Sequence, residues 1–139
     1  MAIRVLRARV AVKGARATWT LPRELLMDRK ALVVATGVGL ALQLAMVIAG
    51  HYSAEVQGLF AVGGMGFSLI AGLVFVWHAR AGWQSDLLGG ALAGGACALL
   101  GIAASVVLGD VPVELLAFGT LASVITGGIG GGIGKLIFR

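Results

Sequence analysis

The sequence predicts an all-α membrane protein with four transmembrane helices, and three observations lead to that prediction. The 139 residues are 59% hydrophobic and only 12% charged, whereas about a quarter of the residues in soluble domains are charged. The mean hydropathy is +1.00. Four segments are apolar over about 20 residues, the length needed to cross a hydrocarbon core about 30 Å thick. A soluble domain of this size could not bury so much apolar surface, so we expect one domain in lipid.

The predicted spans cover residues 31–50, 59–79, 87–109 and 115–134. The links between them are brief, so consecutive helices should be antiparallel neighbours that form two hairpins. Residues 1–30 precede the spans as a basic cytoplasmic tail, and Pro22 and Glu24 mark the start of an interfacial turn that leads into the first helix. We therefore divide the chain into this tail and a four-span domain over residues 31–139.

The distribution of charge predicts the orientation in the membrane. Eight of the eleven basic residues precede the first span, and the other three lie in the second link or after the last span. The first and third links carry only acidic charge, on Glu55, Asp110 and Glu114. Because positive charge marks the cytoplasmic side, we expect a multi-pass protein of a bacterial inner membrane with both termini in the cytoplasm.

The basic tail predicts a contact with lipid. The anionic cytoplasmic leaflet is its nearest partner and attracts each basic residue by about 1 kcal/mol, so we expect no nucleic-acid partner. An arginine-rich, acid-free start is also typical of mitochondrial transit peptides, which is the less favoured interpretation. The residues expected to contact lipid or a partner are Arg4, Arg7, Arg9, Lys13, Arg16, Arg23 and Lys135.

The fourth span ends in a glycine-rich stretch, in which six of the eight residues 127–134 are glycine and Lys135 follows. A phosphate-binding loop requires glycine, four residues, then Gly-Lys and a Ser or Thr. Ile129 stands where the first glycine is needed, and Leu136 follows the lysine. The stretch is therefore not a nucleotide-binding motif.

A membrane helix accounts better for these glycines, because they recur every four residues, the spacing that lets two helix backbones approach closely. Each glycine costs a helix in water about 1 kcal/mol relative to alanine, and close packing would compensate. A broken or re-entrant segment lining a cavity is the first alternative, and simple tolerance of glycine is the second. The residues expected in helix packing are Gly90, Gly94, Gly127, Gly128, Gly131, Gly132 and Gly134.

The predicted spans contain no Asp, Glu, Lys or Arg, which argues against proton or ion coupling. Nor can a nucleophile be combined with a base and an orienting acid, so we predict no catalytic residue and no enzyme. Gln43, midway along the first span, is expected to make one interhelical hydrogen bond rather than a substrate site.

Two histidines raise the question of a metal or haem. His51 and His78 fall at opposite membrane faces, so one chain cannot place both on one haem. His51 is four residues from Glu55, and Asp110 is four from Glu114, which would allow a weak cation site. Solvated link residues are the favoured interpretation, and we predict no metal and no cofactor.

These observations favour a small, non-catalytic structural or accessory subunit that packs against copies of itself or a larger membrane complex. An oligomeric pore or uncoupled small-solute channel, lined by the fourth span, is the alternative. A membrane enzyme or haem subunit is a third class, supported only by the scattered histidines.

Overall fold

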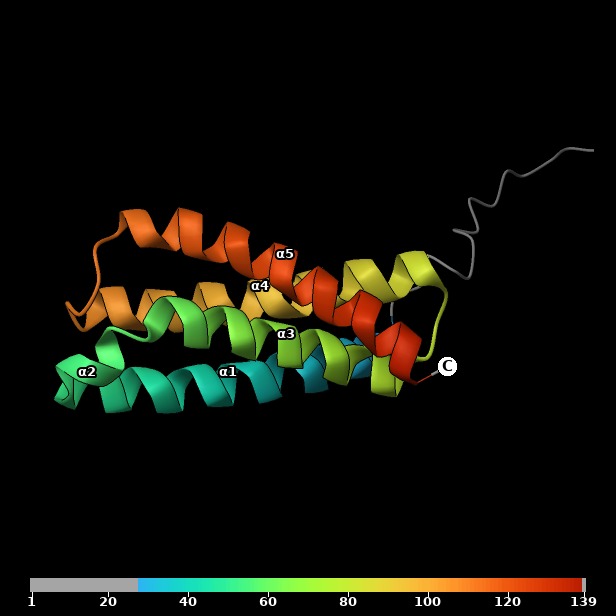
Figure 1. Ribbon diagram of the computed structural model, residues 1–139, viewed down its shortest axis with the longest axis horizontal. Helices are drawn as coiled ribbons and strands as arrows, with labels where there is room; N and C mark the ends of the chain where they lie inside the picture. Colours follow the sequence, from blue (N-terminus) through green and yellow to red (C-terminus); the bar gives the residue numbers. More distant parts are fainter. Residues whose placement is uncertain (1–27, 139) are drawn as a thin grey trace, which may run out of the picture.

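The structure, a computed structural model that describes residues 28–138, contains four helices long and apolar enough to cross a membrane. The described chain is helical, which confirms the predicted multi-pass, all-α class at that level. The long helices are α1 (Arg29–Tyr52), α3 (Phe60–Ala79), α4 (Trp83–Val107) and α5 (Glu114–Ile137), and the short α2 (Ala54–Gln57) lies between α1 and α3. Figure 1 shows the long helices side by side, with consecutive ones running in opposite directions.

The helices differ from the predicted spans mainly at their ends. α4 begins at Trp83, four residues before the predicted start, so Asp86 lies in its first turn rather than in a link. α5 extends past the glycine stretch to Ile137 and is continuous, without the break considered for a re-entrant segment. These extensions bring two ionisable side chains, Asp86 and Lys135, into helices whose apolar parts cross the membrane.

The start of α1 is set by a side-chain cap. Asp28 Oδ1 accepts hydrogen bonds from the backbone N–H groups of Lys30 at 2.9 Å and Ala31 at 3.2 Å. These bonds satisfy donors that have no partner within the helix, and such a cap is typically worth about 1 kcal/mol. Asp28 therefore caps the N-terminus of α1, which begins at Arg29. Residues 1–27, which make up most of the predicted basic tail, lie outside the described residues.

Small residues form most of the core. In α1 the buried positions recur every four residues, at Ala31, Ala35, Gly39, Gln43 and Val47, so one narrow face of this helix enters the bundle. α1 packs against α3 and α4, and α5 packs against the same two helices.

The bundle has two ends, which we name by the segments found there. The terminal end holds the start of α1, the link between α3 and α4, and the end of α5. The α2 end holds α2 and the link between α4 and α5. α5 follows an oblique course between these ends (Figure 1).

Candidate functional site

The first candidate site is a close crossing of α3, α4 and α5 toward the terminal end. At this crossing an added Cβ atom would meet backbone atoms of a neighbouring helix rather than side chains. We call it the glycine junction, and it consists of Gly72, Gly90, Gly94, Gly127, Gly130 and Gly131.

Gly127 lies at the centre of the glycine junction. A Cβ atom built on it would lie 2.5 Å from the carbonyl oxygen of Gly90 and 2.9 Å from the Cα of Gly94, both in α4. On the α3 side, a Cβ atom on Gly72 would overlap the carbonyl oxygen of Gly127. One α5 residue is thus held between the backbones of two helices, and a side chain there would force them apart.

The remaining predicted packing positions on α5 differ in how much space surrounds them. A Cβ atom on Gly134 would lie 3.0 Å from the Cβ of Val76, which is a tight contact with α3. A Cβ atom on Gly128 would lie 3.6 Å from the Cβ of Ala91, and one on Gly132 would lie 3.9 Å from Leu87 Cδ2. Those last two distances are ordinary van der Waals contacts, so both positions have room for a methyl group.

An ion pair closes the terminal end of the bundle. Lys135 Nζ lies 3.0 Å from Asp86 Oδ2 and donates its hydrogen bond to the backbone carbonyl of Ala81. The other carboxylate oxygen, Oδ1, accepts from the N–H of Ala81 at 3.2 Å. Asp86 is completely buried, while Lys135 keeps 18% of its side chain exposed. The expected contact of Lys135 with lipid stays a prediction, and its observed partner is within the chain.

A second polar contact lies at the α2 end. His51 Nδ1 and Asp110 Oδ1 are 2.9 Å apart, and Gln57 Nε2 donates to the carbonyl oxygen of Asp110 at 2.6 Å. These bonds connect the last turn of α1 and the end of α2 to the link between α4 and α5. Within residues 28–138, no three His, Cys, Asp or Glu side chains come together as a metal site would require.

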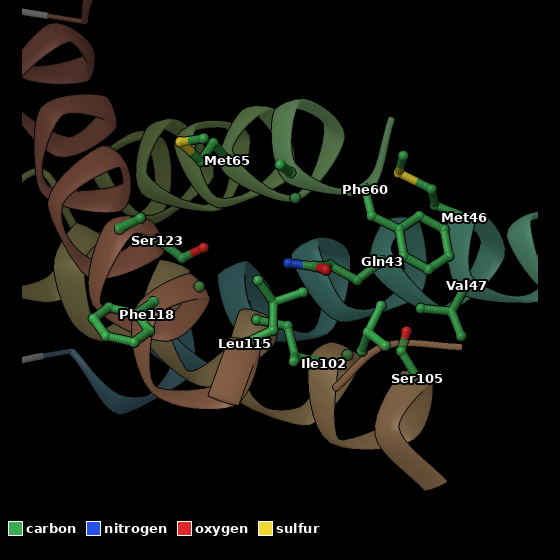
Figure 2. Close-up of a pocket in the computed structure, with 16 residues that line it drawn as sticks. Gln43, Met46, Val47, Phe60, Met65, Ile102, Ser105, Leu115, Phe118 and Ser123 are labelled. Atoms are coloured by element: carbon green, nitrogen blue, oxygen red, sulfur yellow. The ribbon is translucent and has the colours of Figure 1, made fainter. Parts of the chain in front are cut away.

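A cavity of about 220 Å³ lies in the half of the bundle toward the α2 end. Residues from α1, α3, α4 and α5 line it, and most of them are apolar. Figure 2 shows the amide of Gln43 extending into this space, with its nitrogen toward the hydroxyl of Ser123. Gln43 Nε2 is buried, and no acceptor among the described residues meets it with hydrogen-bond geometry. The interhelical hydrogen bond expected of this amide stays a prediction.

Two other side chains of the interior, Ser68 and Cys97, form hydrogen bonds to backbone carbonyl groups. Ser68 Oγ lies within hydrogen-bond distance of two backbone carbonyl oxygens, that of Gly64 at 2.9 Å and that of Gly94 at 3.2 Å. Cys97 Sγ lies 3.2 Å from the same Gly94 oxygen. Gln43 therefore differs from these neighbours in lacking a partner for its donor.

Three features escaped prediction from the sequence. Asp86 looked like a link residue because hydropathy alone marks Leu87 as the start of the apolar run. Gly72 and Gly130 were not among the seven glycines selected above for helix packing, although Gly130 is four residues before Gly134. The cavity has no sequence signal, because its lining comes from four helices.

Comparisons with known proteins give no further guide to this site, since no protein-family model, curated protein or solved structure matches the chain. The predicted tail contacts, Arg4 to Arg23, lie outside the described residues.

Proposed function

We propose that this chain is a non-catalytic integral membrane protein that serves as a structural or accessory subunit of a homo-oligomeric or larger complex. The main support for this proposal is that two pairs of ionisable side chains among the described residues connect segments of the bundle. The Asp86–Lys135 pair joins α4 to α5, and the His51–Asp110 pair joins the last turn of α1 to the link between α4 and α5. Both pairs hold segments of the bundle together, and neither is arranged as a nucleophile with its base.

The outer surface supports the same role. Branched apolar side chains recur every four residues along the exposed face of α5, opposite its glycines, at Leu121, Ile125, Ile129 and Ile133. Such a row forms a continuous ridge that lipid tails or the groove of another membrane helix can cover. The glycines of the glycine junction already contact helices of the same chain, so association with a partner would use ridges of this kind.

Charge asymmetry supports an orientation for this subunit. We place both termini in the cytoplasm of a bacterium, with the basic tail against anionic lipid of the inner membrane or a cytoplasmic partner. The terminal end of the bundle would then lie at the inner leaflet, and the His51–Asp110 contact would lie at the outer one.

A pore lined by the glycine-rich fourth span is the alternative function. In the described bundle, the glycine face of α5 is in contact with the backbones of α3 and α4. A pore along that face would require those helices to separate. The contacts within one chain therefore favour the accessory role over the pore.

Co-purification tests the proposal. Two differently tagged copies of the full chain would be expressed together, extracted in mild detergent and captured by one tag. We expect recovery of the second tag in a defined ratio, or of an unrelated membrane protein in a defined ratio. Mixing copies that were expressed separately and solubilised first serves as the control, because detergent-induced aggregation would appear there as well.

Two results would count against the accessory role. The first is a monodisperse monomer with no stoichiometric partner at native expression level. The second is sustained solute flux through liposomes that contain only this protein, with empty liposomes remaining tight, which would favour the pore.

A further inference from the structure

The geometry points to a binding site for a small, uncharged, largely apolar molecule that carries a hydrogen-bond acceptor, held in the cavity beside Gln43. This assignment is independent of the accessory role proposed above. The site uses the half of the bundle toward the α2 end, whereas the glycine junction belongs to the half toward the terminal end.

The unpartnered donor of Gln43 carries the inference. Only 6% of Gln43 is exposed, and its Nε2 has no partner among residues 28–138. A buried donor without an acceptor destabilises the folded state, because its hydrogen bond to water has been lost without replacement. Figure 2 shows this nitrogen aimed into open space, toward Ser123 on the far wall. An acceptor placed between the two side chains would remove that cost.

Two glycines make the space in which the amide lies. A Cβ atom on Gly101 would come within 2.8 Å of Gln43 Oε1, so this glycine is needed for the side chain to occupy its position. A Cβ atom on Gly64 would lie 3.8 Å from the same oxygen, at the edge of the cavity. The same Cβ atom would lie 4.0 Å from Nε2, so the amide is packed against α4 at Gly101 and has room for a small group beside it at Gly64.

The size and chemistry of the lining define the ligand class. A cavity of about 150 Å³ lined by apolar side chains binds benzene, and this one is about 220 Å³, so one substituted ring fits. Among residues 28–138, the side chains that line the cavity carry no charge, and the larger ones are Met46, Phe60, Met65, Leu115 and Phe118. An ionised ligand would pay a large desolvation penalty there, which leaves neutral molecules.

The depth of Gln43 in the membrane indicates that the ligand is not an ordinary bilayer lipid. Gln43 is about 4 Å along the axis from the middle of the 24-residue helix α1. Lipid ester carbonyls lie at the edge of the hydrocarbon core, about 15 Å from its centre. The acceptor must therefore belong to a molecule that dissolves in the core itself. A carbonyl on a single apolar ring meets that requirement.

The cavity has an entrance from the lipid. Met65 of α3 and Phe118 of α5 line the cavity and are also exposed on the outer surface. A ring compound dissolved in the bilayer can enter between these two helices without crossing an aqueous phase.

Binding can be measured by ¹⁹F NMR on the full chain in nanodiscs, with empty nanodiscs as the reference for partitioning. The probe is 4-fluoroacetophenone, and its matched control is 4-fluoro-α-methylstyrene, in which a CH₂ group replaces the carbonyl oxygen. We expect saturable binding of the ketone, about fivefold tighter than that of the alkene, the typical effect of one neutral hydrogen bond. Absence of saturable ketone binding, or equal affinity for the two probes, would overturn the assignment.

Variants locate the bound probe. Gln43→Leu removes the donor and should weaken ketone binding about fivefold while leaving the alkene unchanged. Gly64→Val places methyl groups in the cavity and should abolish binding of both probes. Gly66→Val, on the same helix, is the matched control because an added Cβ there meets nothing within 4 Å. Undiminished ketone binding to folded Gln43→Leu or Gly64→Val would refute the site, and if either variant fails to fold, the probe pair on the unaltered chain decides.

Discussion

Lys135 Nζ lies 3.0 Å from Asp86 Oδ2, so the last turn of α5 is tied to the first turn of α4. Each charge also occupies the favourable end of its own helix. An acidic side chain near an N-terminus and a basic one near a C-terminus both complement the helix dipole. The pair therefore stabilises two helix ends as well as their contact.

Removing either partner should destabilise the bundle, and the two losses should be unequal. Lys135→Met leaves a fully buried carboxylate without its counter-ion, and breaking a buried pair in this way typically costs about 3 to 5 kcal/mol. Asp86→Asn leaves a lysine that is 18% exposed and can extend toward the interface, so its cost should be smaller. Unfolding by SDS titration in mixed micelles measures both.

The double variant Asp86→Asn/Lys135→Met provides the control for that comparison. It removes both charges and should be more stable than Lys135→Met alone, since no buried charge remains unpaired. Equal stability of Lys135→Met and the unaltered protein would show that the pair contributes nothing to the fold.

Gly39 and Cys97 should be coupled in a double-mutant cycle. A Cβ atom on Gly39 would lie 2.8 Å from Cys97 Sγ and 3.0 Å from Ala71 Cβ, so Gly39→Ala overpacks the contact of α1 with its neighbours at a cost of about 1 to 3 kcal/mol. In a Cys97→Ala background the sulfur is gone, and we expect part of that cost to disappear. Additive free energies of unfolding would be inconsistent with this contact.

The matched control for Gly39→Ala is Gly37→Ala. An added Cβ at Gly37, two residues earlier in α1, meets nothing within 4 Å. That variant should hold or gain stability, by up to about 1 kcal/mol, because alanine has the higher helix propensity.

Membrane orientation can be tested by cysteine labelling on intact cells. In a Cys97→Ala background, Ser53→Cys should react with a membrane-impermeant thiol reagent, and Ala2→Cys should not until the cells are permeabilised. The reason is the charge asymmetry, which assigns the first link to the outer face. Labelling at position 2 but not at position 53 would invert the orientation.

Prediction from the sequence succeeded where a property depends on one segment. Hydropathy over about 20 residues is a local quantity, and it placed each long helix within a few residues of its observed position. The start of α4 was missed because Asp86 is charged, and its burial depends on Lys135, whose helix was expected to end at Gly134. No local pattern reveals a partner 49 positions along the chain.

The same is true of the candidate sites: a spacing within one helix could be predicted, whereas the contacts between helices could not. Four-residue glycine spacing indicates a face suited to close packing, but the spacing cannot say which members meet a backbone. A Cβ atom on Gly131 would overlap the carbonyl oxygen of Asp86, whereas one on Gly132, about 100° further around the helix, would meet only Leu87 Cδ2 at 3.9 Å, an ordinary van der Waals distance. Gln43 was visible as a polar residue in an apolar span, but its lack of a partner depends on the paths of three other helices.

Specific glycines of α5 allow the backbones of α3 and α4 to approach this helix closely. The most direct test compares Gly131→Ala with Gly132→Ala in the full chain, by SDS-titrated unfolding. A Cβ at Gly131 would overlap the carbonyl oxygen of Asp86, while one at Gly132 meets only Leu87 Cδ2 at 3.9 Å.

We predict that Gly131→Ala lowers the free energy of unfolding by about 1 to 3 kcal/mol, that Gly131→Leu lowers it further, and that Gly132→Ala leaves it unchanged or higher. Equal stability of the two alanine variants, or unchanged stability with leucine at both Gly127 and Gly131, would contradict the account.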